Sequence, residues 1–132
     1  MSHKKQIDAD CIERWQAIVS DTNWQKGEVI ATYFANDLHA RDGEFAHQVG
    51  GITAEYLRKL RLVWDRFWDV RGNYPTLRWV HFYMALEWPD AHVWLRRADV
   101  QKLNPSEMVR LRFFELPLIN REKADAMKEG HE

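Results

Sequence analysis

The chain has 132 residues, of which 45% are hydrophobic and 30% charged, and its formal net charge is −1. This balance is typical of one globular domain and excludes a disordered chain. The single cysteine excludes an intramolecular disulfide and any zinc site with two or more thiolates. No apolar run is long enough for a membrane span, and the N-terminus lacks the apolar core of a signal peptide. We therefore expect a cytoplasmic protein with no membrane partner, and a charge near zero means that any nucleic-acid surface is local.

Glycine and proline are scarce, with six and four residues, while aromatic residues make up 13% of the chain. Few turn formers favour helices over a fold with many short strands. We expect an all-α fold of about seven helices in a compact bundle, forming a single domain over residues 1–119. The polar segment 120–132 is expected to be a frayed C-terminal tail.

Two helices are expected in the first forty residues, over about 8–19 and about 24–38. The segment 20–23 reads SDTN, and these residue types are typical of helix N-caps, so we predict a break between the two helices. Their apolar stripes contain Ile12, Trp15 and Ile18 or Val19 in the first helix, and Ile30, Tyr33, Phe34 and Leu38 in the second.

A short third helix over about 43–49 is expected to end at the two glycines that follow it, and Thr53 is a suitable cap for a long fourth helix reaching about residue 70. The residues that we expect to point inward from this pair are Phe45, Ala46, Val49, Tyr56, Leu57, Leu60, Val63, Trp64, Phe67 and Trp68.

Three further helices are expected after the loop at 71–75. Thr76 is expected to cap a fifth helix over about 77–88, which is apolar nearly all round and is therefore expected to be central. Asp90 is expected to cap the sixth. The seventh begins at the strong start signal NPSE, at 104–107, and ends near 116–118. Its inward residues are expected to be Met108, Leu111 and Phe113 or Phe114.

The segment 43–60 has the pattern of a helix-turn-helix, in which a short helix, a tight turn and a second helix cross closely. Ala46 is small where the helices would cross. Gly50 or Gly51 is expected to take a positive φ at the turn, and Thr53 is expected to cap the second helix. The exposed positions of that second helix are then predicted to be Ala54, Glu55, Arg58, Lys59 and Arg61.

Over residues 43–112 the chain resembles the helix-turn-helix domain of ParB/KorB-type DNA-binding proteins. The resemblance is carried by the helix-turn-helix itself, by the helix at 77–86 with the sequence LRWVHFYMAL, and by the polar helix at 90–99 followed by LNPSEM at 103–108. The turn is one residue longer than in that family, and no nucleotide-binding motif precedes it. The resemblance therefore implies DNA binding without implying CTP use or plasmid partition.

We expect the protein to bind double-stranded DNA in a regulatory or accessory role, such as transcription regulation. Thr53 is expected to bond a phosphate, Ala54 and Glu55 to face bases, and Arg58, Lys59 and Arg61 to meet phosphates or guanine edges. The alternative from a different class is a non-catalytic helical module that binds proteins and not DNA. Binding that weakens steeply with salt distinguishes the first from the second.

The charge pattern indicates two basic sets, which together favour a concentrated basic face. The alternative is that they are ordinary solvated helix faces with acidic neighbours. The first set is Arg58, Lys59, Arg61, Arg66 and Arg71, and the second is Arg96, Arg97, Lys102, Arg110 and Arg112.

No catalytic, cofactor or metal site is expected. His39 and His47 are eight residues apart and do not match the spacing of a helical zinc pair, so we do not expect them to bind a metal with Asp42 and Glu44. No nucleophile elbow or glycine-rich phosphate loop is present. We interpret His81 as a satisfied core histidine, His92 as a surface residue, and Cys11 as a small buried or half-buried residue.

Seven tryptophans exceed what one small core usually needs, and tryptophan is enriched at interfaces. We therefore expect a homodimer, which is also what a protein reading paired half-sites requires. Trp15 and Trp24, which precede the helix-turn-helix, are the candidates for that interface.

Overall fold

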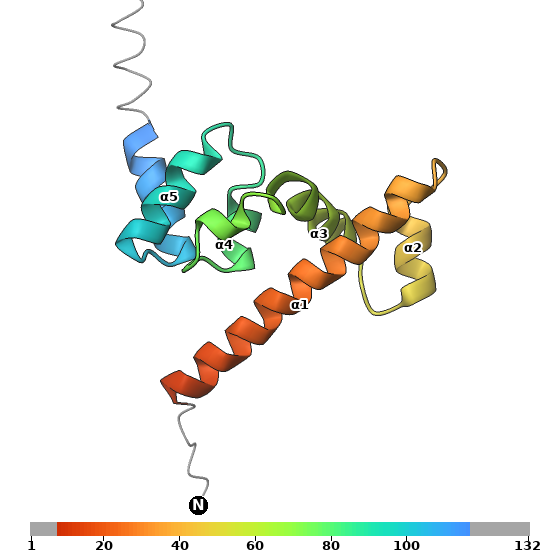
Figure 1. Ribbon diagram of the computed structural model, residues 1–132, viewed down its shortest axis with the longest axis horizontal. Helices are drawn as coiled ribbons and strands as arrows, with labels where there is room; N and C mark the ends of the chain where they lie inside the picture. Colours follow the sequence, from red (N-terminus) through yellow and green to blue (C-terminus); the bar gives the residue numbers. More distant parts are fainter. Residues whose placement is uncertain (1–7, 117–132) are drawn as a thin grey trace, which may run out of the picture.

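The computed structural model describes residues 8–116, and within this range every regular element is helical (Figure 1). The elements are α1 (Ala9–Asn36), α2 (Asp42–Val49), α3 (Ala54–Phe67), the 3₁₀ turn η1 (Arg71–Asn73), α4 (Trp79–Met84) and α5 (Ala91–Gln101), and residues 105–116 are helical as well. The all-α prediction is confirmed. The predicted domain end at residue 119 and the tail at 120–132 lie outside the described residues.

The predicted break at 20–23 is wrong, because α1 runs through it as one helix of 28 residues. The polar side chains of this segment find partners that leave the helix intact. Thr22 donates back to the carbonyl of Ile18 at 2.7 Å. The Ser20 hydroxyl accepts the backbone N–H of Trp79, the first residue of α4, at 2.9 Å. Ser20 therefore does act as a cap, but for a helix that lies far away in the sequence.

Helix α1 crosses α3 closely, and Gly27 is the residue that permits the approach. A Cβ atom at this position would lie 2.7 Å from the carbonyl oxygen of Leu60 and 3.0 Å from the Cβ of Trp64. Backbone cannot move aside as a flexible side chain can, so only glycine fits here without a shift of one helix. This crossing positions α1 as the support of α3.

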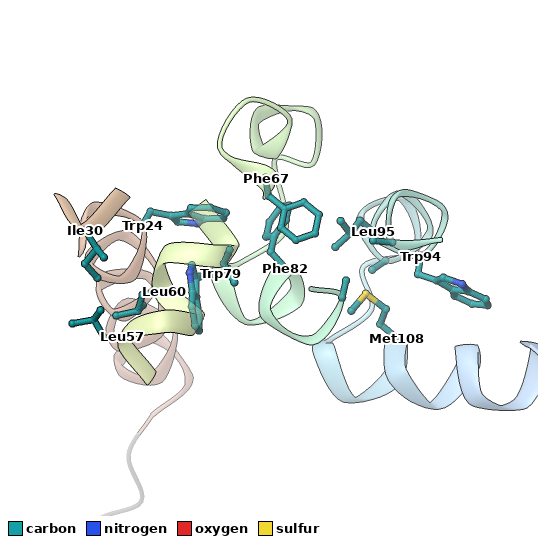
Figure 2. Packing of buried hydrophobic residues seen from close by; sticks show 14 of the residues in the cluster. Trp24, Ile30, Leu57, Leu60, Phe67, Trp79, Phe82, Trp94, Leu95 and Met108 are labelled. Atoms are coloured by element: carbon teal, nitrogen blue, oxygen red, sulfur yellow. The ribbon is translucent and has the colours of Figure 1, made fainter. Parts of the chain in front are cut away.

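The core is one continuous cluster of buried side chains, to which every α-helix contributes (Figure 2). Trp24 and Ile30 of α1 pack with α3 and α4 at one end, and Phe82 contacts both Trp24 and Phe67 with ring centroids 5.2 and 5.3 Å apart. At the other end the cluster continues into α5 and the last helix. Its fully buried large members are Leu57, Leu60, Val63, Phe82, Trp94, Leu95 and Met108.

Helices α3 and α4 are shorter than predicted. Helix α3 ends at Phe67, not near residue 70, and α4 covers Trp79–Met84, not 77–88. The early end of α4 is stabilised by Arg66, whose guanidinium donates to the backbone carbonyls of Ala85, Leu86 and Trp88. In a longer helix, backbone N–H groups of the next turn would have bonded these carbonyls.

Two of the three predicted caps in the second half of the chain accept no backbone N–H of the helix that follows them. Thr76 does not cap α4, because its N–H donates to Asp99 at 2.9 Å and its hydroxyl to the same carboxylate. Asp90 occupies the N-cap position of α5, but its carboxylate accepts from the Trp94 indole and from Arg112. The prediction for the last helix is confirmed, since Asn104 accepts the N–H of Glu107 at 2.8 Å.

Several apolar residues predicted to point inward are exposed. The largest group lies on the first half of α1, which extends beyond the other helices in Figure 1. The others are near the end of α1 and just after it, on α2, at both ends of α3 and on the last helix. The exposed members are Ile12, Trp15, Ile18, Val19, Tyr33, Leu38, Val49, Tyr56, Trp68, Phe113 and Phe114. Trp24, by contrast, is buried, so it is a core residue and not an interface candidate.

Candidate nucleic-acid interface

Helices α2 and α3 form a tight corner through a four-residue connection. Gly50 and Gly51 both have a positive φ, of 72° and 71°, which confirms the predicted turn chemistry. The N–H of Gly50 donates to the carbonyl of Ala46 at 3.0 Å and closes α2. Ala46 is only 6% exposed, so it lies inside the corner as its size predicted.

Thr53 caps α3 as predicted. Its side-chain oxygen accepts the N–H of Tyr56 at 3.1 Å, and its backbone is extended. The buried face of α3 then follows with Leu57, Leu60 and Val63. Glu55 and Arg58 lie away from this buried face, so the first turns of α3 present polar side chains to solvent.

Four of the predicted DNA-binding residues are exposed at this end of α3. They are Thr53, Ala54, Glu55 and Arg58. They bring to one helix start a hydroxyl, a methyl group, a carboxylate and a guanidinium, which are groups that contact phosphates and base edges in the major groove.

Lys59 and Arg61 are not fully exposed, and this corrects the predicted exposed face. The Lys59 side chain is 22% exposed, and its ammonium nitrogen lies 3.7 Å from a carboxylate oxygen of Glu87. The Arg61 guanidinium donates bidentate hydrogen bonds to the Asp42 carboxylate, and the shortest, from Nη2 to Oδ2, is 3.0 Å. Its guanidinium also lies 4.4 Å from the centre of the Phe34 ring. Arg61 therefore joins α3 to both α2 and α1, and this engagement is structural.

Four of the eight other residues in the two predicted basic sets are also used inside the fold. Arg71 lies 4.8 Å from the Trp24 ring and 5.2 Å from the Trp64 ring. Arg97 pairs with Glu115, and Arg112 pairs with Asp90 while it lies over Trp88. Arg66 is bound to backbone carbonyls, and the remaining members of the two sets, Arg58, Arg96, Lys102 and Arg110, are exposed.

Sequence reasoning missed the polar residues that α2 exposes beside the corner, which are Glu44, His47 and Gln48. The first helix of such a corner crosses the DNA backbone, so its exposed side chains belong to the candidate surface. The signal was present in the sequence, because these positions face away from Ala46 on a helix whose inward face was already assigned.

The histidine and cysteine predictions have different outcomes. His81 is buried, and both ring nitrogens are satisfied, since Nδ1 accepts the N–H of Arg78 at 3.1 Å and Nε2 lies 2.8 Å from the Leu103 carbonyl oxygen. Burial lowers the pKa of His81, against the opposing effect of the bond to the Leu103 carbonyl. His92 is exposed as predicted, but Cys11 is exposed and not buried.

The predicted absence of a metal site concerns His39, Asp42, Glu44 and His47. Among residues 8–116, no three histidine, cysteine or acidic side chains gather closely enough to hold a metal ion. In that same range, no helix has the length and the apolar character needed to cross a membrane.

Comparison with known proteins adds no relative. No protein-family model, no curated protein and no solved structure matches this chain. The candidate site is therefore defined by its own geometry.

Proposed function

We propose that the protein binds double-stranded DNA through the corner of α2 and α3, in a regulatory or accessory role. The observation that carries the proposal is the free N-terminal end of α3. Thr53, Ala54, Glu55 and Arg58 are exposed there, directly after a two-glycine turn that positions α3 against α1 and α2. A helix held in this way by two others is the arrangement that places a recognition helix in the major groove.

Arg58 has the central role in this proposal. It lies one turn into α3 and is exposed, whereas Lys59 and Arg61 are held by Glu87 and Asp42. We propose that Arg58 contacts a phosphate or a guanine edge and that Thr53 contacts a phosphate, with Ala54 and Glu55 facing bases. Lys59 and Arg61, which pair with Glu87 and Asp42, contribute positive charge near the DNA backbone. No cofactor and no catalytic step belong to this function.

The proposal is tested by measuring the affinity of the protein for a random duplex at two salt concentrations. Affinity is expected to fall steeply with salt, because phosphate contacts release counterions. Arg58→Ala is expected to reduce the salt slope by about one unit if the contact is to a phosphate. Arg96→Ala, which removes an exposed arginine from α5, is the matched control and is expected to leave the slope unchanged.

The double variant Arg58→Ala with Lys59→Ala is expected to keep its helical circular-dichroism spectrum and to lose most DNA affinity. The buried residues of α3, such as Leu57 and Leu60, are unchanged in it. No binding by the wild-type protein at low salt, or equal loss from the Arg96→Ala control, contradicts the proposal.

A second candidate function is a protein-binding module that does not bind DNA. A separate observation favours it: Trp15 is 69% exposed, and it lies on a helix that carries further exposed apolar residues. Binding that depends on this helix is insensitive to salt, because burial of apolar surface does not release counterions from a polyanion.

A further inference from the structure

The first eleven residues of α1, from Ala9 to Val19, form an arm in which every residue is exposed. Ile12, Trp15 and Ile18 are 45%, 69% and 60% exposed. The first hydrogen bond from this arm to another element is the one between Gln16 and Arg78. A helical segment of this length gains little stability by itself in water, and its large apolar side chains need a partner surface.

The exposed apolar residues belong to a seam that continues along α1 with the spacing of a coiled coil. Steps of four and three residues alternate along it, and all of its members are exposed or half-buried. The seam consists of Cys11, Trp15, Ile18, Thr22, Gln25 and Val29. Its apolar part is at the arm end, and its polar members lie in the middle.

The far end of the seam opens into an apolar groove. This groove has a volume of about 450 Å³ and lies between α1, the end of α2 and the glycine turn. Val29, Phe45, Val49 and Ile52 are among the residues that line it. One end of the seam therefore projects large apolar side chains, and the other end offers a hollow of matching character.

We propose that a second copy of this chain packs antiparallel along the seam, so that each arm occupies the groove of the other copy. A two-fold axis near the middle of the seam pairs Cys11 with Val29 of the second copy, and Ile18 with Thr22. The arm of each copy then reaches the hollow of the other. An interface of this kind is self-complementary, as two-fold symmetry requires.

Charge favours the antiparallel direction. Asp8 occupies a seam position one heptad before Trp15, so parallel helices would place it against its own copy. Antiparallel helices place it instead opposite Thr32. On one flank of the seam, Arg14 of each copy then faces Glu28 of the other. Asp21 meets its own copy near the axis, but at a solvent-exposed edge where such a contact has a small cost.

The oligomeric state is measured by sedimentation equilibrium, independently of DNA. We expect the wild type to form a dimer, and Trp15→Glu to raise its dissociation constant by about 30-fold or more, as expected for an anchor residue. Val100→Glu is the matched control, because Val100 on α5 is 71% exposed and lies outside the seam. It is expected to leave the dissociation constant unchanged. A monomer at all concentrations, or equal effects of the two variants, overturns the proposal.

Charge reversal tests the pairing of Arg14 with Glu28. Arg14→Glu and Glu28→Arg are each expected to weaken the dimer. The protein that carries both changes is expected to recover wild-type association, because the two charges are then exchanged across the interface. If the double variant is weaker than either single variant, the proposed register is wrong.

The single cysteine of the chain tests the direction of the helices. In the variant Val29→Cys, mild oxidation is expected to produce a covalent dimer between Cys11 and the new cysteine of the second copy. The same change in a Cys11→Ser background is expected to give none. Rapid formation of a covalent dimer by the wild type places Cys11 beside its own copy, and that result overturns the antiparallel arrangement.

Discussion

The two halves of α1 carry apolar residues at the same helical spacing but have opposite environments. In the second half, Trp24 and Ile30 are 7% and 3% exposed, and Gly27 brings the helix against α3. In the first half, Trp15 is 69% exposed. Apolar periodicity therefore predicts a helix with one apolar face, but not whether that face is covered by the same chain or by another.

The largest expected effect comes from truncating Trp24, and the same truncation of Trp15 is its comparison. Trp24→Ala removes a side chain that packs against the rings of Trp64 and Phe82, and we expect it to lower the free energy of unfolding by about 3–5 kcal/mol. Trp15→Ala is expected to change the stability of the monomer by no more than about 0.5 kcal/mol. Urea denaturation at a protein concentration well below the dimer dissociation constant measures both, and equal losses would contradict the difference between the halves.

The crossing at Gly27 is tested with a second pair of variants. Gly27→Ala is expected to destabilise the protein by about 1–3 kcal/mol, since the new methyl group collides with the backbone of α3. Gly43, at the start of α2, has no atom within 4 Å of the place where a Cβ would be. Gly43→Ala is therefore expected to leave stability unchanged or to raise it by up to about 1 kcal/mol. A stabilising Gly27→Ala change would show that the two helices can separate at no cost.

The corner of α2 and α3 is tested by Ala46→Leu. This residue is buried between the helices, and overpacking is expected to reduce the free energy of unfolding by about 1–3 kcal/mol. Ala54→Leu, on the exposed side of α3, is the control and is expected to have little effect. Thermal denaturation followed by circular dichroism compares them, and an Ala46→Leu variant that melts at the wild-type temperature would disprove the close crossing.

The smallest expected effect is a dependence of stability on pH that arises from His81. Burial lowers the pKa of this histidine in the folded state, so the unfolded chain binds a proton more readily than the folded one. The contribution of neutral His81 is therefore complete above its unfolded pKa of about 6.5 and is lost as the pH falls below that value. Denaturation midpoints between pH 8 and pH 5 measure the slope, and His81→Gln is expected to flatten it.

Much of the fold was predictable because local signals were also correct globally. The two glycines after Val49, the Thr53 cap and the start signal at 104–107 depend only on neighbouring residues, and the structure confirms each of them. The exposed residues at the start of α3 follow from the same local pattern. The role of Arg61 did not, because its partner Asp42 is nineteen positions away and either residue alone suits a surface.

Backbone preference and apolar spacing act over a few residues, so the helical fold, the turn between α2 and α3 and the buried face of α3 could be predicted from the amino-acid sequence. The other features depend on contacts that form only in the folded chain. The tertiary structure showed that Ser20 caps α4 and that Thr76 binds Asp99. It also showed that most arginines of the two basic sets contact partners within the fold, and that no other segment of residues 8–116 buries the arm of α1. A cap, an ion pair or a buried face is completed by groups that are distant in the sequence, and their positions exist only once the chain has folded.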